Sequence, residues 1–274
     1  MSIIFEDATY IYNKGTPMEK IAIKGLSLSV ESGEFVGVLG RPGSGRSTFL
    51  QLLGGLLKPT SGRIMIPTQP NPLPQGGRRK IGSGVGVVFQ FPERQFFEET
   101  VYADLSFPLR RAGISEGDIE FRIKDALGSV DMDFHTYRNR PPTELSSGEK
   151  RRVAIAAILV LTPEVIALDE PLAALDGKGK REIVKELKRL QREMGKTVVV
   201  ATQDWEGVSK ICDRVILLEN GVLAGDGRAD LMEGRISWMS PMASFVEILK
   251  RRGVDLGEGI IDAEEAFLRV KRVS

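Results

Sequence analysis

The sequence contains a single cysteine, Cys212, and a single histidine, His135. One cysteine cannot form an internal disulfide, so the chain is typical of a reducing compartment. The formal net charge of +1 gives no overall attraction to nucleic acid. The longest apolar run, 153–161, is about half of what a membrane-spanning helix needs. The first residues lack the pattern of a signal peptide, so we expect any membrane role to be exerted through a partner.

The chain has 274 residues, of which 42% are hydrophobic and 27% charged, as in an ordinary globular protein. This length is enough for one large domain, or for a core with an appendage. Short apolar runs alternate with amphipathic segments up to about residue 225, which predicts an α/β fold. We expect strands at 3–12, 21–30, 35–39, 64–66, 85–89, 165–168, 197–201, 214–218 and 222–224, and helices at 101–111, 116–130, 150–161 and 180–194.

The segment 40–47 matches the phosphate-loop template G-x-x-x-x-G-K-[ST] at every fixed position but one, where Arg46 replaces lysine. A short apolar strand precedes the loop and a helix follows it. In that context, backbone N–H groups wrap the phosphates of a nucleotide at the helix N-terminus. We therefore predict a nucleotide site formed by Gly40, Arg41, Pro42, Gly43, Ser44, Gly45, Arg46, Ser47 and Thr48.

A buried strand at 165–168 ends in two acids, Asp169 and Glu170. Sheets of this class bind ligands at the carboxyl ends of their parallel strands. One carboxylate can hold Mg²⁺ while the next orients a water molecule. The pair therefore predicts a metal ligand followed by a carboxylate that orients a water molecule.

Three further features each allow two interpretations. Tyr12, at the end of the first strand, could stack on an adenine ring or be an ordinary edge-strand tyrosine. The serines and glycine of 145–149 could present donors to an anion, or could cap the helix that follows. The segment 91–100 has three phenylalanines among charged residues, and could form a contact surface or a small satellite core.

With these motifs in order, residues 1–225 resemble the ATP-binding subunit of ABC transporters. The resemblance implies a P-loop NTPase (RecA-like) parallel core with an N-terminal antiparallel β subdomain, a helical subdomain and a C-terminal helical extension. It implies ATP and Mg²⁺ as ligands and ATP hydrolysis as the activity. The catalytic residues would be Glu170, Gln203 and the Q-loop glutamine Gln90. Tyr12, Ser146, Ser147, Gly148 and the D-loop residue Asp176 would also contact nucleotide, and Ser47, Gln90 and Asp169 would hold the metal ion.

The segment 89–101 is similar to the one that follows the Q-loop in energy-coupling factor (ECF) transporters, which import vitamins and metals. The resemblance implies that Phe91–Thr100 contacts a transmembrane coupling subunit, while a separate membrane subunit chooses the substrate. It implies an ATP-binding domain over 1–226, with a helical subdomain inserted at about 91–152, and a dimerisation extension over 227–274. The chain would lie peripherally on the cytoplasmic face of the cell membrane, without a nucleic-acid partner.

Two departures from the family's pattern fall in one site. Arg46 is bulkier and more planar than lysine, and the two are not interchangeable. Gln203 occupies the position of the family's switch histidine, and His135 lies on a different segment. Loss of one positioned charge-stabilising donor costs about 10²–10³ in rate. We therefore expect slow turnover in the chain's own site.

The segment 145–149 resembles the family's signature, usually written LSGGQ. This signature departs from the family pattern more mildly, because Ser147 replaces a glycine and Glu149 a glutamine. Our hypothesis is that this signature completes the active site of a second, intact ATPase subunit in a heterodimer. One alternative is a fully active homodimeric ABC ATPase. Another is a soluble ABC protein that acts on DNA or ribosomes, although one cassette without a heptad segment argues against it.

Overall fold

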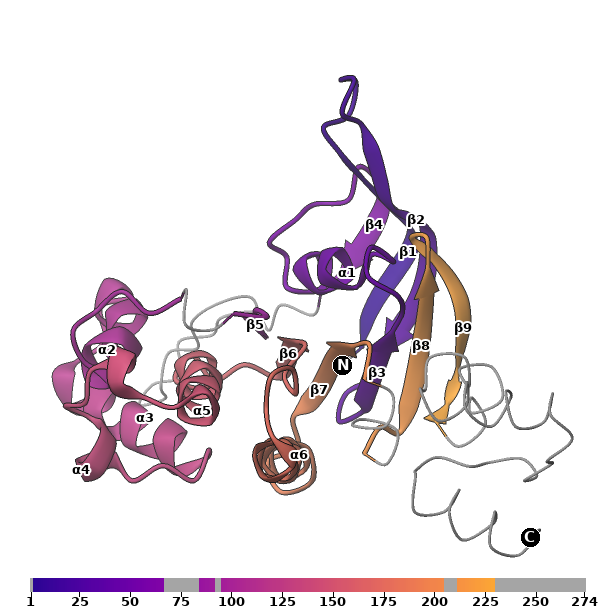
Figure 1. Cartoon of the computed structure of the whole chain (residues 1–274). Coiled ribbons are helices and arrows are strands. Elements are labelled where there is room, and N and C mark those ends of the chain that lie inside the picture. Colours follow the sequence, from indigo (N-terminus) through magenta and orange to yellow (C-terminus); the bar gives the residue numbers. More distant parts are fainter. Residues whose placement is uncertain (1, 67–83, 92–94, 205–210, 230–274) are drawn as a thin grey trace, which may run out of the picture.

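The computed structural model describes residues 2–66, 84–91, 95–204 and 211–229. These residues form two sheets and a group of helices (Figure 1). A three-stranded sheet has the order β2-β1-β4, and a six-stranded sheet has the order β5-β6-β7-β3-β8-β9. The predicted α/β architecture is confirmed.

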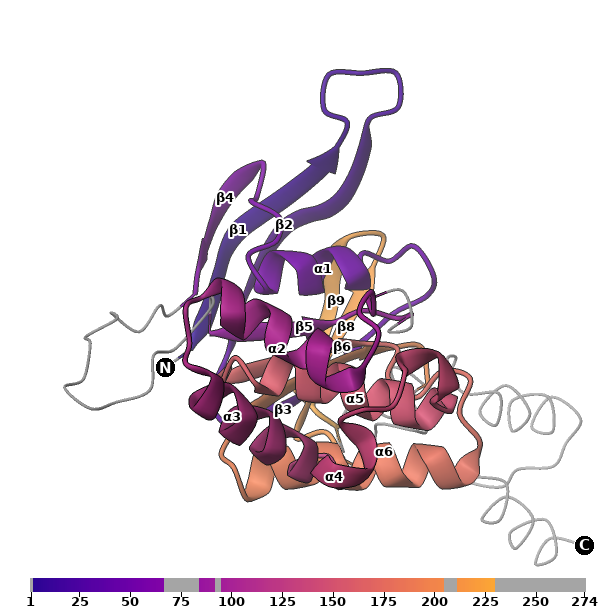
Figure 2. The same ribbon diagram turned by 90° about the vertical axis from the view of Figure 1, so that its left-hand side faces the viewer.

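The three-stranded sheet is antiparallel, as the sequence predicted. Its strands are β1 (Ile3–Tyr12), β2 (Lys20–Val30) and β4 (Ser61–Met65). The β1–β2 hairpin projects beyond the rest of the molecule (Figure 2). At the outer end of the paired strands, Tyr12 is the register partner of Lys20. Residues opposite each other in an antiparallel pair present their side chains to the same face.

The six-stranded sheet is parallel except at one edge. The parallel strands are β3 (Phe35–Leu39), β5 (Val85–Val88), β6 (Val165–Asp169), β7 (Thr197–Thr202) and β8 (Arg214–Glu219). The edge strand β9 (Val222–Arg228) runs antiparallel to β8. Asn220 and Gly221 make the turn between them with φ of 50° and 80°, as the Asn-Gly dipeptide predicts.

Alternating side chains of the central strands build two separate cores. One face of the six-stranded sheet carries Val36 and Val38, which pack with Phe49 of α1 (Arg46–Leu53) and with the three-stranded sheet. The other face carries Phe35 and Leu39, which belong to the core shared with α5 (Ser147–Leu159) and α6 (Gly177–Arg192). The helix α1 therefore lies between the two sheets (Figure 1).

The remaining helices lie to one side of the six-stranded sheet (Figure 1). They are α2 (Val101–Arg111), α3 (Glu116–Gly128), α4 (Phe134–Tyr137) and the 3-10 turn η2 (Pro142–Glu144). The described phenylalanines of the segment 91–100 differ in burial. Phe96 packs against the core, whereas Phe91 and Phe97 are 46% and 65% exposed.

Two helices begin three residues before the predicted positions. The reason is capping: Ser146 accepts a hydrogen bond at the start of α5, and Asp176 does so at the start of α6. The helical dimerisation extension expected over 227–274 lies outside the described residues, apart from residues 227–229. Within the described ranges, no helix has the length and apolarity needed to cross a bilayer.

Candidate nucleotide site

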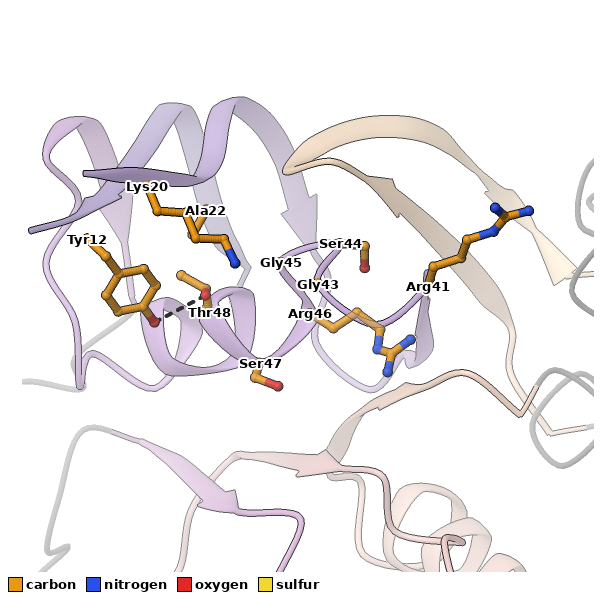
Figure 3. A pocket seen from close by; sticks show the side chains of 10 residues that line it. All are labelled: Tyr12, Lys20, Ala22, Arg41, Gly43, Ser44, Gly45, Arg46, Ser47 and Thr48. Atoms are coloured by element: carbon orange, nitrogen blue, oxygen red, sulfur yellow. Dashed lines mark hydrogen bonds between the residues drawn. The ribbon is translucent and has the colours of Figure 1, made fainter. Parts of the chain in front are cut away.

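The phosphate loop connects β3, in the interior of the parallel sheet, to the N-terminus of α1 (Figure 3). Two glycines give the loop its shape. Gly45 adopts φ of 103°, and a Cβ at this position would lie 2.5 Å from the carbonyl oxygen of Ala22. A Cβ on Gly40 would lie 2.2 Å from Ser44 Oγ. Because neither position has room for a side chain, the loop needs glycine at both positions to adopt this backbone.

The loop has the features of an anion site. The N-cap residue of α1 is Gly45, which has no side chain to cap the helix, so the first N–H groups of α1 face the loop. Ser44 Oγ is buried and has no hydrogen-bond partner among the described residues. A buried hydroxyl without a partner is costly unless a ligand satisfies it. The loop therefore suits a phosphate group.

A pocket of about 140 Å³ opens above the loop. Tyr12 forms one side of the pocket, with its hydroxyl 3.2 Å from Thr48 Oγ1 (Figure 3). The structure thus brings the predicted adenine-stacking residue together with the loop. The lining residues are Tyr12, Lys20, Ala22, Arg41, Gly43, Ser44, Gly45, Arg46, Ser47 and Thr48.

Arg46 turns away from the pocket toward the ends of the parallel strands (Figure 3). Its Nη2 donates to Glu170 Oε1 at 2.6 Å, and its Nη1 donates to the carbonyl oxygen of Gly40. The ion pair is largely buried, with 10% and 7% of the two side chains exposed. Arg46 Nε has no hydrogen-bond partner among the described residues, so the pair leaves part of the guanidinium unsatisfied.

Both the carboxylate and the backbone carbonyl of Glu170 accept further hydrogen bonds. Its Oε1 also accepts from the backbone N–H of Gln203 at 3.1 Å, and its Oε2 accepts from Thr202 Oγ1 at 2.8 Å. The backbone of Glu170 adopts φ of 49°, and its carbonyl oxygen accepts from Arg151 Nη1 at 2.6 Å. A non-glycine residue in this conformation persists only where its surroundings hold it. The carboxylate that the family resemblance assigns to catalysis is thus bound to Arg46 and two further donors.

Asp169 ends β6 beside the loop and is 7% exposed. Burial raises the pKa of Asp169, while a hydrogen bond from Ser47 and the charge of Arg46 act to lower it. A carboxylate next to a hydroxyl is a suitable donor pair for Mg²⁺, which proteins often hold by one or two carboxylates together with nucleotide phosphates. The described residues contain no cluster of three or more acids, histidines or cysteines that could hold a metal alone. Ser47 and Asp169 therefore fit a Mg²⁺ ion that arrives with the nucleotide.

Of the remaining predicted residues, Gln203 contacts this centre through its backbone N–H, which donates to Glu170 Oε1. Gln90 is exposed two residues after the end of β5, and the side chain of Gln203 is exposed directly after β7. Asp176 caps α6 by accepting from Gly179 N at 2.7 Å. His135 lies in α4, where its ring contacts Phe134. The described structure thus places His135 in the helical group and not beside Glu170 (Figure 1).

The signature segment adopts the capping geometry that its sequence allowed. Ser146 Oγ accepts from Glu149 N at 3.3 Å, and Glu149 Oε2 accepts from Ser146 N at 2.7 Å, which forms a capping box. Glu149 Oε1 also accepts from the Tyr137 hydroxyl at 2.8 Å and from Arg140 Nη1 at 3.1 Å. Burial acts to raise the pKa of Glu149, but these hydrogen bonds and the charge of Arg140 lower it to about 2.

Sequence reasoning missed four residues of the site. Lys20 and Ala22 line the pocket, Thr202 binds the Glu170 carboxylate, and Arg151 binds the Glu170 carbonyl. The pairing of Tyr12 with Lys20 across the hairpin was the signal for Lys20, but several register shifts between β1 and β2 hide it in the sequence. The other two contacts join segments that are distant in the sequence.

Comparisons with known proteins agree with this geometry. The family model described as "ABC transporter" matches residues 23–173. The energy-coupling factor transporter ATP-binding protein EcfA2 of Clostridium perfringens (strain 13 / Type A) is 39% identical and is matched over 99% of both chains. A putative ABC transporter ATP-binding protein of Methanosarcina mazei is 37% identical over 100% of this chain and 93% of its own length.

Two solved structures have the same fold. One is cbiO1 from Clostridium perfringens, described as part of the ABC transporter complex cbiONQ, with a TM-score of 0.73 and 33% identity over 89% of this chain and 98% of its own. The other is the ATP-binding cassette MJ0796, described as a dimer in a post-hydrolysis state bound to ADP and Pi. Its TM-score is 0.69, with 31% identity over 83% of this chain and 98% of its own.

Proposed function

This chain belongs to the ABC transporter family, in its energy-coupling factor branch, and on that premise we propose that it drives the uptake of a vitamin or other micronutrient through membrane partners. The chain is an ABC-type ATPase. ATP would bind with its base on Tyr12 and its phosphates in the loop, where α1 and Ser44 supply donors. Mg²⁺ bound at Ser47 and Asp169 would neutralise phosphate charge during the reaction.

We propose further that the chain's own site turns over slowly, and the Arg46–Glu170 ion pair carries this proposal. Before Glu170 can orient a water molecule, its carboxylate must give up a buried contact of 2.6 Å. Separating a buried pair without a replacement partner costs about 3–5 kcal/mol. In addition, Gln203 cannot handle a proton as histidine does.

The signature supports a role toward a second subunit. The family resemblance implies that this segment faces the nucleotide of the partner ATPase. Ser146 lies at the N-terminus of α5, a 13-residue helix whose dipole favours an anion. We therefore propose a heterodimer, in which Ser146, Ser147 and Gly148 complete the partner's active site and Asp176 lies at the interface between the subunits.

The exposed phenylalanines support a membrane partner. Phe97 and Phe107 form an edge-to-face pair, with ring centroids 4.8 Å apart, and both are exposed. Together with the exposed Phe91, this apolar surface suits a transmembrane coupling subunit. Peripheral association with the membrane through that subunit follows from the same proposal.

The test is ATP turnover of the purified chain, alone and with a second ATPase subunit of the transporter. We expect turnover alone to be at least about 10²-fold slower than with the partner, and Arg46→Lys with Gln203→His to raise turnover of the chain alone by about 10-fold or more. Arg63→Lys, on an exposed arginine of β4, is the control for the arginine replacement and should change nothing. Robust turnover by the wild-type chain alone would favour the active homodimer and contradict the slow site.

A further inference from the structure

Few of the basic side chains that line the pocket point toward the place where the phosphate loop would bind phosphate. Three basic residues line it: Lys20, Arg41 and Arg46. The charge of Arg46 is paired with Glu170, below the loop. The side chain of Arg41 extends away from Tyr12, past the far end of the loop (Figure 3). The nucleotide therefore meets fewer cations in the loop than the loop's own sequence suggests.

Lys20 is placed to supply a charge from the other side. It is the first residue of β2 and the register partner of Tyr12, so the backbone directs both side chains to the same face. Its amine reaches into the space between the Tyr12 ring and Gly45 (Figure 3). Lys20 forms no ion pair with any other residue in the described part of the chain.

We propose that Lys20 binds the nucleotide at its α-phosphate and replaces the positive charge that Arg46 withdraws from the loop. A nucleotide with its base on Tyr12 and its terminal phosphates at Gly43–Ser47 must place the ribose and α-phosphate between them, where the Lys20 amine lies. The inference rests on the proposed placement of the nucleotide. It adds a binding residue that lies outside the phosphate loop, on the neighbouring sheet.

The chemistry of lysine suits this position. Its ammonium is a compact charge on a flexible stem, which can follow a phosphate without fixed geometry. The contact is exposed to water, so salt should weaken it. Because the α-phosphate is present in ATP, ADP and AMP, Lys20 should contribute to the affinity for all three, and not to the affinity for adenosine.

The test is isothermal titration calorimetry of ADP with Mg²⁺ on the full chain at low ionic strength, with AMP and adenosine measured by displacement of ADP. Lys20→Met removes the charge and keeps the apolar stem, and we expect it to weaken ADP and AMP binding by about 5-fold to 10-fold. Lys20→Arg should restore most of the affinity. Lys24→Met, on an exposed lysine of the same strand outside the pocket, is the matched control and should bind as the wild type does.

Each outcome has a definite meaning. Weaker binding of ADP and AMP with unchanged binding of adenosine supports the inference. Equal ADP affinity of Lys20→Met and the wild type overturns it, and so does an equal loss for adenosine, which would make Lys20 a residue of the base pocket. If the wild-type chain binds no ADP at all, the proposed nucleotide site itself fails.

Discussion

Two of the arginine–glutamate pairs in the described part of the chain, one beside the phosphate loop and one at the signature, have opposite consequences. Beside the phosphate loop, Arg46 binds Glu170 and occupies the carboxylate that the proposed chemistry requires. At the signature, Arg140 binds Glu149, and the pair reinforces the cap of α5 while Ser146 stays at the helix N-terminus. The position of an ion pair relative to the reacting groups therefore decides whether the pair impairs or supports a site.

The two pairs also differ in burial. The side chains of Arg46 and Glu170 are 10% and 7% exposed, whereas those of Arg140 and Glu149 are 34% and 18% exposed. A buried pair is difficult to separate because each charge needs a new partner. A partly solvated pair is worth less and yields more easily. The first pair therefore acts as a restraint on Glu170, and the second as a modest support for the signature.

The signature hydroxyl of Ser146 is the side chain whose loss we expect to lower turnover most. Ser146→Ala, in the assembled transporter, should lower ATP turnover by about 10²–10³-fold, because in the proposed heterodimer it removes a hydroxyl that contacts the partner's nucleotide. Steady-state ATP hydrolysis of the purified complex is the measurement.

The substitution also removes a helix cap, which costs about 0.5–2 kcal/mol of stability. Ser115→Ala controls for that loss, since Ser115 caps α3 by accepting from Asp118 N at 3.3 Å and has no assigned role at the nucleotide. If both variants lower turnover equally, the signature is a structural cap alone.

A smaller effect concerns stability. Glu149→Gln should lower the free energy of unfolding by about 1–3 kcal/mol at pH 7, because the amide cannot accept all the hydrogen bonds that the carboxylate accepts. The folded pKa of Glu149 is about 2, below its value of 4.5 in the unfolded chain. The stabilisation by the charged carboxylate is therefore complete above about pH 5 and is lost as the pH falls toward 2.

Denaturant unfolding at a series of pH values checks this dependence. Glu144→Gln, on a neighbouring exposed carboxylate, is the control and should change stability by less than about 0.5 kcal/mol. A difference between Glu149→Gln and the wild type that stays constant down to pH 3 would contradict the assigned role of the charge.

Most of the architecture could be predicted from the sequence, because local patterns of apolar residues and glycines determine it. The strand expected at 165–168 was recognisable from its apolar run, and the phosphate loop from its glycine spacing. The side chain to which Arg46 binds was not predictable, because the contact depends on how closely the end of β6 approaches α1. The split between buried Phe96 and exposed Phe97 was hidden for a similar reason, since neighbouring phenylalanines in an irregular segment have no periodicity to separate them.

We propose that the chain contributes to catalysis through its signature and not through its own carboxylate, Glu170. The most direct test of this proposal compares Glu170→Gln with the same replacement at the matching glutamate of the second ATPase subunit, each in the assembled transporter, by steady-state ATP turnover. We predict that Glu170→Gln changes turnover by less than about 2-fold, while the replacement in the second subunit lowers it by about 10²-fold or more. Equal losses from the two replacements would contradict the account.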